Sequence, residues 1–351
     1  MAVRTLIVDD SPTMRAVLQM LLEVDSDIEV VGAAADANEA RSMIRLLNPD
    51  VITLDIEMPG MNGLEFLAKI MTLRPMPVII VSSLTSKGAD TTMQALQIGA
   101  FDCYVKPQGF GGDTIAADGG MLSRLIHLAA RHGRTSLEGK KLATPPVAAG
   151  LNPPLAMPLS TATPELIAIG ASTGGVEALT QLLANWDRNC PPTLIVQHIF
   201  GSFAEALTTR LDSICPAKVM AAETDTFLKP GHVYVAPGSE RHLVVRGTNR
   251  PMSRLLDGPA HSGHRPSIDK LFMSVAQKMP GRALGIILTG MGSDGALGLL
   301  KMRQSGSPTI AQDRKTSLVY GMPRAAAENG AALHILPLSG IAKKARALCR
   351  V

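Results

Sequence analysis

The sequence predicts an α/β protein built from two doubly wound domains with mostly parallel sheets. In both halves of the 351-residue chain, short apolar runs alternate with amphipathic stretches of helical period. Such alternation is typical of parallel sheets that helices cover on both faces. Between the halves, residues 142–164 are rich in proline, alanine and threonine, as in a linker. The length also agrees with two domains at about 150 residues each.

The first domain is expected over residues 1–120. Its apolar runs predict strands at 5–8, 29–33, 51–54, 78–81 and 102–105. Helical patterns follow at 12–24, 37–47, 63–72 and 87–98. Residues 108–120 lose all periodicity, and we expect a linker over 121–161 that contains a short helix at 121–132.

The second domain is expected over residues 162–351. Predicted strands lie at 166–169, 193–197, 232–236, 242–245, 284–288, 309–311 and 334–336. Predicted helices lie at 175–184, 202–213, 267–278, 293–304 and 322–328. Gly238 falls between the third and fourth strands, which predicts a β-hairpin appended to the sheet.

Composition excludes several functional classes. Aromatic residues make up only 3% of the chain, which disfavours a stacking platform for single-stranded nucleic acid. The four cysteines form no C-x-x-C pair, which argues for a reducing compartment and against structural zinc. We find neither a signal-peptide pattern nor about 20 consecutive apolar residues, so we expect a cytoplasmic protein that does not insert into membranes.

Charge is distributed unevenly along the chain. Residues 1–107 hold 8 Lys and Arg against 14 Asp and Glu, whereas residues 161–351 hold 21 against 13. An acidic first domain and a basic second domain either attract each other or leave the second free for an acidic partner. Unrelated surface compositions would give the same counts, so charge alone does not decide.

Polar side chains follow several strands of the first domain. Asp9 and Asp10 end the first strand, Asp55 the third, Ser82 the fourth and Lys106 the fifth. Because the carboxyl ends of parallel strands meet at one edge, these groups are expected to lie together. Carboxylates there would suit Mg²⁺, and a lysine with a hydroxyl facing them would suit a transferred phosphoryl group. The alternative is that the acids are helix caps and the lysine a surface charge.

The same residues carry a family resemblance over 4–107. The motifs are L-I-V-D-D-S at 6–11, D-I-E-M-P-G-M-N-G at 55–63, V-S-S at 81–83 and Y-V-K-P at 104–107. In combination they resemble a two-component response-regulator receiver domain. The resemblance implies a flavodoxin-like fold with a five-stranded parallel sheet. It also implies Asp55 as the phosphoacceptor and Ser82 and Lys106 as the residues that sense the phosphoryl group.

The resemblance implies a cofactor and a phosphodonor as well. Asp10, Asp55 and the backbone carbonyl of Glu57 would hold Mg²⁺, with Asp9 in support. A histidine kinase would supply the phosphoryl group. One departure is Cys103, which stands where receivers often carry a switching tyrosine or phenylalanine.

The second domain opens with a serine between glycines, at a predicted strand-to-helix turn. Ser172 lies in G-A-S-T-G at 170–174, a setting that suits an exposed nucleophile. His198 and Asp294 follow two other predicted strands, so a Ser–His–Asp arrangement for acyl transfer is expected. A dinucleotide-binding loop is the alternative, but this loop, G-A-S-T-G-G at 170–175, is not a G-x-G-x-x-G motif.

These residues also resemble a family, over about 166–340. I-G-A-S-T-G-G at 169–175, V-Q-H at 196–198, P-G at 237–238, H-R-P-S-I-D at 264–269 and L-T-G-M-G-S-D-G-A at 288–296 are similar to the catalytic domain of CheB-type chemotaxis methylesterases. By this resemblance Ser172, His198 and Asp294 form the triad and Met291 contributes an oxyanion N–H. Thr173 and residues 264–269 would line or support the cleft.

The resemblance implies a hydrolase that removes glutamate γ-methyl esters from methyl-accepting chemotaxis receptors and deamidates specific receptor glutamines. Phosphorylation would relieve inhibition by the receiver, and no cofactor would serve the ester hydrolysis. We further expect a monomer without nucleic-acid partners. A non-catalytic phosphorylation-dependent binding module, a transcription factor and a nucleotide-dependent oxidoreductase are the alternatives. His261 and His264 suggest a metal site, but no third ligand is apparent, and substrate-side loop residues are the simpler interpretation.

Overall fold

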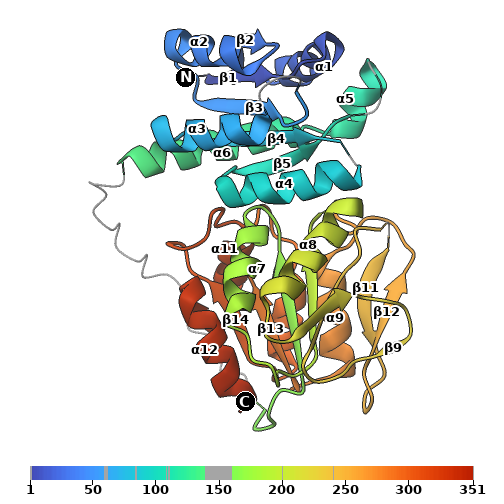
Figure 1. Cartoon of the computed structure of the whole chain (residues 1–351). Helices are drawn as coiled ribbons and strands as arrows, with labels where there is room; N and C mark the ends of the chain where they lie inside the picture. Colours follow the sequence, from blue (N-terminus) through green and yellow to red (C-terminus); the bar gives the residue numbers. More distant parts are fainter. Residues whose placement is uncertain are drawn as a thin grey trace. The chain divides into compact units, whose positions relative to one another are not determined.

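The chain forms two compact units, Met1–Thr144 and Pro145–Val351, in the computed structural model (Figure 1). The structure describes residues 2–58, 62–83, 85–107, 109, 111–138, 160–199, 201–239 and 241–350. Most of the proline-rich stretch predicted as linker, residues 142–159, lies outside the described residues. Among the described residues, no helix combines the length and the apolar character needed to cross a membrane.

The first unit contains a five-stranded parallel sheet in the order β2-β1-β3-β4-β5. Its strands are β1 (Val3–Val8), β2 (Ile28–Ala34), β3 (Val51–Asp55), β4 (Val78–Ser82) and β5 (Asp102–Val105). Its first four helices are α1 (Pro12–Glu23), α2 (Ala37–Leu47), α3 (Gly63–Leu73) and α4 (Ser86–Ile98). The predicted receiver-type fold is confirmed, and the predicted bounds of these elements differ from the observed ones by at most two residues at either end.

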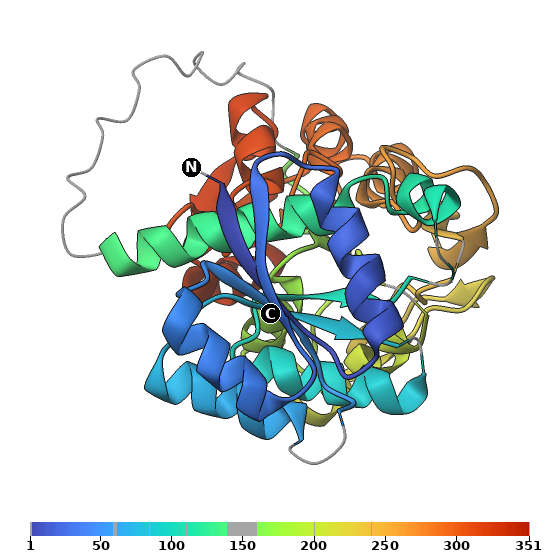
Figure 2. The ribbon, with the colours of Figure 1, turned by 90° about the horizontal axis from the view of Figure 1, so that it is seen from above.

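Two further helices follow the fifth strand. The absence of regular structure predicted over 108–120 is wrong in part, because α5 (Gly112–Asp118) is a short helix there. Seven residues are too few to show a helical period in the sequence. α6 (Met121–Glu138) is longer than predicted and packs with α1 on one side of the sheet, opposite α2, α3 and α4 (Figure 2). Its buried face consists of Leu122, Leu125, Ile126, Ala129 and Ala130.

The second unit is built on a seven-stranded, all-parallel sheet in the order β15-β14-β13-β6-β7-β10-β8. The strands are β6 (Leu166–Ala171), β7 (Thr193–Gln197), β8 (Lys218–Ala221), β10 (His232–Val235), β13 (Ala283–Ile287), β14 (Thr309–Gln312) and β15 (His334–Leu336). Helices α7 (Gly175–Ala184), α8 (Gly201–Ile214) and α12 (Leu338–Cys349) lie together. Helices α9 (Ile268–Lys278), α10 (Ala296–Gln304) and α11 (Met322–Glu328) share a buried apolar cluster with the sheet.

A small antiparallel sheet is appended to this unit, but its strands differ from those predicted. β11 (His242–Arg246) pairs with β12 (Met252–Leu256), which also pairs with β9 (Thr226–Phe227). The predicted pairing of β11 with β10 is wrong, because β10 lies inside the parallel sheet between β7 and β8. β10 is buried along nearly its whole length, as interior parallel strands are. β8, β9 and β12 are short or lack alternation and were not predicted.

In each parallel sheet the strand order reverses at one point. In the first sheet this point lies between β1 and β3, and in the second between β6 and β13. Ligands of doubly wound folds bind at such points, outside the carboxyl ends of the strands. Asp9 and Asp55 flank the first point, and Ser172 and Asp294 flank the second.

Candidate active site and phosphoacceptor site

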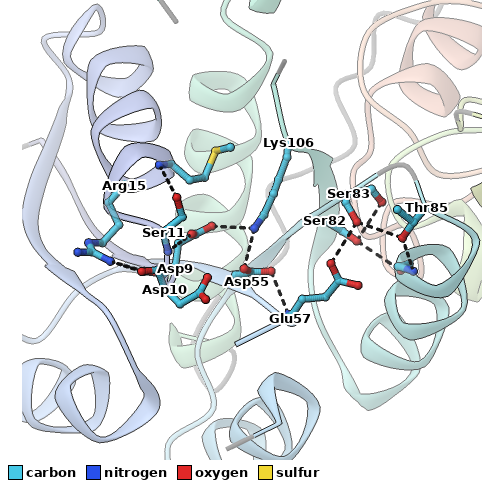
Figure 3. Close-up of polar contacts among 12 residues, drawn as sticks. Asp9, Asp10, Ser11, Arg15, Asp55, Glu57, Ser82, Ser83, Thr85 and Lys106 are labelled. Atoms are coloured by element: carbon cyan, nitrogen blue, oxygen red, sulfur yellow. Dashed lines mark hydrogen bonds and ion pairs between the residues drawn. The ribbon is translucent and has the colours of Figure 1, made fainter. Parts of the chain in front are cut away.

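The predicted acidic residues of the first unit meet around one lysine (Figure 3). Lys106 Nζ lies 2.6 Å from Asp55 Oδ2 and 3.1 Å from Asp9 Oδ2. Burial and the charge of Asp55 raise the pKa of Asp9, while Lys106 acts in the opposite direction. Burial alone would lower the pKa of Lys106, but its hydrogen bond to Asp55 and the charges of both carboxylates raise it. Lys106 is therefore a fixed positive charge facing the two acids.

Backbone groups hold the two carboxylates in place. Asp9 Oδ1 accepts from the Ser11 N–H at 2.9 Å, and Asp55 Oδ1 accepts from the Glu57 N–H at 3.0 Å. Ser82 is buried at the end of β4, where its hydroxyl donates to the Gly88 carbonyl in the first turn of α4 at 3.3 Å. The site thus connects β3, which carries Asp55, with β4, which leads into α4.

The donor set fits a divalent cation. Carboxylate oxygens of Asp9, Asp10 and Asp55 all lie within 4.8 Å of one another, and among the described residues no other group of three His, Cys, Asp or Glu is this close. Mg²⁺ prefers a few carboxylate oxygens and keeps several waters. The charge of Lys106 alone does not balance three acids. The residues present therefore suit Mg²⁺, whereas His261 and His264 belong to no such group in the described part of the chain.

In the second unit, glycines allow a tight turn between β6 and α7. Gly174 precedes α7 with a φ of 75°, in the left-handed region that favours glycine. A Cβ on Gly175 would lie 2.0 Å from Gln197 Oε1. Gln197 is buried, and its amide donates to the Ser172 carbonyl at 2.9 Å and to the His198 carbonyl at 3.2 Å. This glutamine was not singled out from the sequence, although it directly precedes the predicted histidine.

The three residues predicted as a triad form one hydrogen-bonded chain. His198 Nδ1 lies 3.2 Å from Ser172 Oγ, and His198 Nε2 lies 2.8 Å from Asp294 Oδ2. The carboxylate can only accept here, so Nε2 carries the proton and Nδ1 offers its lone pair to the serine. The geometry is that of a nucleophile with its general base and an orienting acid.

Asp294 lies at the N-terminus of α9, where it accepts several hydrogen bonds. Oδ2 accepts from the Ile268 N–H at 2.7 Å, and Oδ1 accepts from the Asp269 N–H at 3.1 Å and the Ser267 hydroxyl at 2.9 Å. Burial alone would raise the pKa of Asp294, but His198 and these amides lower it to about 2. Asp294 is therefore ionised at neutral pH.

A second buried acid lies beside Asp294 and behaves oppositely. Asp269 is 1% exposed and accepts from the Gly298 N–H of α10 at 2.6 Å. Burial, together with the charge of Asp294, raises the pKa of Asp269. His261 Nε2 lies 3.9 Å from the Asp269 carboxylate. The pKa values of the two neighbouring carboxyl groups are therefore shifted in opposite directions, and Asp294, which contacts His198, is the stronger acid.

Backbone N–H groups beside the serine are available to a substrate oxygen. The Ser172 N–H is used, because it donates to the Thr289 carbonyl at 3.0 Å. Within the described part of the chain, the N–H groups of Met291 and Thr173 donate no hydrogen bond. Gly290 keeps this turn close to the serine, since a Cβ there would lie 2.6 Å from the Ser172 Cβ.

Residues 261–264 form a tight turn over the histidine. Ser262 and Gly263 have φ values of 52° and 80°, and the backbones of His261 and His264 exchange two 3.0 Å hydrogen bonds. The turn stacks the His264 ring on the His198 ring, with centroids 3.7 Å apart and planes within 9°. The segment predicted to line or support the cleft thus contacts the His198 imidazole directly.

A serine–histidine–aspartate chain at the switch point of one α/β unit, and a carboxylate–lysine cluster at that of the other, define a hydrolase joined to a receiver domain. Sequence comparison agrees, with a family model for CheB methylesterase over residues 167–345 and one for response regulator receiver domains over 5–112. The chain belongs to the CheB methylesterase family, with a receiver domain preceding the methylesterase domain.

Relatives match over nearly the whole chain. A protein-glutamate methylesterase/protein-glutamine glutaminase of Agrobacterium fabrum is 51% identical over 97% of this chain and 95% of its own length. One of Caulobacter vibrioides is 47% identical over 97% of this chain and 96% of its own length. The crystal structure of the Thermotoga maritima CheB methylesterase catalytic domain matches 54% of this chain and all of that chain, with 34% identity and a TM-score of 0.51. The predicted family, fold and enzyme class are confirmed.

Proposed function

We propose that this protein is a phosphorylation-activated methylesterase that hydrolyses glutamate γ-methyl esters on the cytoplasmic helices of chemoreceptors. Ser172 is the nucleophile, His198 the general base and acid, and Asp294 the orienting acid. The observation that carries this proposal is the hydrogen-bonded chain from Ser172 Oγ through both nitrogens of His198 to Asp294. A dinucleotide-binding loop or a binding module without catalysis has no need of this chain.

In the first half-reaction, Ser172 Oγ attacks the γ-carbonyl carbon of the ester while His198 Nδ1 takes the hydroxyl proton. Asp294 stabilises the imidazolium that forms. The Met291 and Thr173 N–H groups stabilise the negative charge on the carbonyl oxygen, and each such donor is typically worth about 3 kcal/mol of barrier. The C–O bond to the methoxy group then breaks, His198 returns its proton, and methanol leaves an acyl-serine.

Water completes the reaction by the same steps in reverse. His198 Nδ1 takes a proton from water, whose oxygen attacks the acyl carbon, and the Ser172 oxygen leaves with the proton. The products are a receptor glutamate and the free serine. With a glutamine substrate, ammonia leaves in place of methanol, so the same residues support deamidation. None of these steps calls for a cofactor.

The receiver supplies control through Asp55. Phosphorylation by a histidine kinase would add roughly two negative charges beside Lys106. Bound Mg²⁺ would offset this charge, held by Asp10, Asp55 and the Glu57 carbonyl with Asp9 in support. The Ser82 hydroxyl, which donates to the Gly88 carbonyl, would turn to the phosphoryl group and release the first turn of α4. The receiver would then cease to block the methylesterase domain.

The partners follow from the same activity. Methyl-accepting chemotaxis receptors are the substrate, and the excess of basic residues over 161–351 suits their acidic helices. The protein acts in the cytoplasm as a monomer, without nucleic acid. An ~100-fold activation requires only about 2.7 kcal/mol of bias between the blocked and open states.

Methanol release from a methylated chemoreceptor cytoplasmic fragment tests the function. Wild type, Ser172→Ala and Asp55→Ala are compared with and without Mg²⁺ and a small-molecule phosphodonor. We expect release by wild type and Asp55→Ala, none by Ser172→Ala, and stimulation by the donor only in wild type. Absence of release by wild type with the donor present would contradict the esterase activity, and donor stimulation of Asp55→Ala would contradict the phosphoacceptor.

A further inference from the structure

A buried histidine outside the triad contacts one hydrogen-bond donor and one hydrogen-bond acceptor. His242, at the start of β11, is 3% exposed. Its Nδ1 lies 3.2 Å from the backbone nitrogen of Ser267, and its Nε2 lies 3.0 Å from the Pro259 carbonyl oxygen. An amide N–H can only donate and a carbonyl can only accept. These contacts therefore place a proton on Nε2 and direct the lone pair of Nδ1 at the Ser267 N–H.

Ser267 connects this histidine to the triad. It is fully buried, and its hydroxyl donates to Asp294 Oδ1 at 2.9 Å. Ser267 is also the N-cap of α9, accepting from the Lys270 N–H at 3.3 Å. The next two amides, of Ile268 and Asp269, both donate to Asp294. The backbone of Ser267 thus sets where three of the donors to Asp294 lie.

The Ser267 N–H would lack a partner without His242. It precedes the first turn of α9, where backbone N–H groups have no acceptor within the helix. A buried N–H without an acceptor carries a desolvation cost, so loss of the imidazole favours a shift of this backbone. Such a shift moves the donors to Asp294, and through Asp294 the ring of His198.

We propose that His242 is a positioning residue for the triad. Its Nδ1 holds the Ser267 backbone, which fixes Asp294 and thereby the direction of His198 Nδ1 toward Ser172. The antiparallel sheet then has a part in catalysis, because β11 carries the imidazole that supports the acid. This inference rests on the proposed esterase function, and nothing in the proposed reaction steps assigns a role to His242.

Two conservative substitutions test the roles of the two ring nitrogens separately. In His242→Asn the amide oxygen takes the place of Nδ1 and can accept from Ser267. In His242→Gln the amide reaches the place of Nε2 and can donate to Pro259, but it leaves the Ser267 N–H without an acceptor. His232→Gln is the matched control, since His232 begins β10, where its Nδ1 lies 3.0 Å from the Pro230 carbonyl oxygen and its ring stacks on Tyr234, outside the triad.

Steady-state methanol release by the full chain gives the first readout. We expect His242→Gln to lower kcat about 10- to 100-fold with little change in KM, because misplacement of catalytic groups acts on the chemical step. His242→Asn should stay within about threefold of wild type, as should the control. Equal kcat for the Gln and Asn variants would overturn the proposal. A wild type that releases no methanol would instead refute the proposed function.

Proton NMR gives a second readout that does not depend on activity. The proton between His198 Nε2 and Asp294 should give a low-field resonance in wild type, in His242→Asn and in the control. We expect this resonance to shift or broaden in His242→Gln. If it is unchanged there while the protein remains folded, His242 does not position the triad, and the proposal fails even where kcat has fallen.

Discussion

His198 presents Nε2, and not Nδ1, to Asp294, at a distance of 2.8 Å. In the serine-protease arrangement the two nitrogens have the opposite partners. Rotation of the ring about Cβ–Cγ would turn carbon atoms toward both Ser172 and Asp294, so a ring flip does not exchange the two nitrogens. Asp294 therefore fixes the Nε2–H tautomer and leaves the lone pair of Nδ1 directed at Ser172.

Asp294→Asn should remove most of the activity. The asparagine amide would present an N–H₂ group to at least one of the donors that now face the carboxylate, and it would not hold the Nε2–H tautomer. A loss of about 10³- to 10⁴-fold in kcat is expected, with KM nearly unchanged. Asp212→Asn is the matched control, because Asp212 pairs with Lys218 in the same unit away from the triad. A loss below tenfold would exclude Asp294 from the chemistry.

The low pKa of Asp294 also predicts how stability depends on pH. The folded pKa of about 2 is below the ordinary aspartate value of 3.8, so the carboxylate stabilises the fold above pH ~4. The shift corresponds to roughly 2 kcal/mol at neutral pH. This contribution is lost as the pH falls from about 4 to 2. Urea unfolding of wild type and Asp294→Ala should therefore give a difference in free energy that shrinks over this range, and a constant difference would contradict the assignment.

Local sequence patterns were enough to predict most of the helices and strands. β7 and β15 begin and end at the predicted residues, because apolar runs with clear boundaries define them. The predicted partner of β11 was wrong because a local sequence pattern indicates where a strand lies but not which strand it pairs with. β10 is buried and lies inside the parallel sheet. The strand that pairs with β11 is β12, whose Met-Ser-Arg-Leu-Leu sequence lacks the alternation that would have predicted a strand.

The residues of the site likewise divide into those that local sequence patterns predicted and those that they did not. Ser172, His198 and Asp294 were predicted because each follows a strand in a glycine-rich or otherwise distinctive turn. Gln197 and His242 were not, since a glutamine inside a strand and a lone histidine carry no spacing signal. Their importance depends on contacts with Ser172 and Ser267, 25 residues away in each case. Such long-range contacts exist only in the folded chain.

Gly175→Ala should destabilise the second unit and impair catalysis. The added Cβ would lie 2.0 Å from Gln197 Oε1 and 2.8 Å from the Ala171 Cβ, so Gln197 must move. Movement of its amide breaks the hydrogen bonds to the Ser172 and His198 carbonyls. Overpacking of this kind costs about 1–3 kcal/mol. Thermal unfolding and methanol release are the measurements.

Gly340→Ala is the matched control for that substitution. Gly340 lies in the first turn of α12, where an added Cβ would meet Pro337 at an ordinary 3.7 Å. Alanine is the better helix former, so this variant should be unchanged or up to about 1 kcal/mol more stable. If Gly175→Ala and Gly340→Ala have the same Tm and the same rate of methanol release, the packing of Gln197 does not require a glycine at position 175.

Lys106→Met should make the first unit depend on Mg²⁺ for stability. Without the ammonium, the buried carboxylates of Asp9 and Asp55 lose the cation that contacts both of them. Loss of one partner from such a cluster costs roughly 2 kcal/mol, since Lys106 is partly exposed. The pKa of Asp9, already raised by burial, should rise further, so lowering the pH from 7 to 5 should restore part of the stability.

Calorimetry of the full chain measures this dependence. Addition of Mg²⁺ should raise the Tm of the first unit more in Lys106→Met than in wild type, because the cation replaces the missing charge among the three carboxylates. Arg41→Met, at an exposed position of α2, is the control and should respond to Mg²⁺ as wild type does. Equal Mg²⁺ shifts for wild type and Lys106→Met would show that the cation does not bind among Asp9, Asp10 and Asp55.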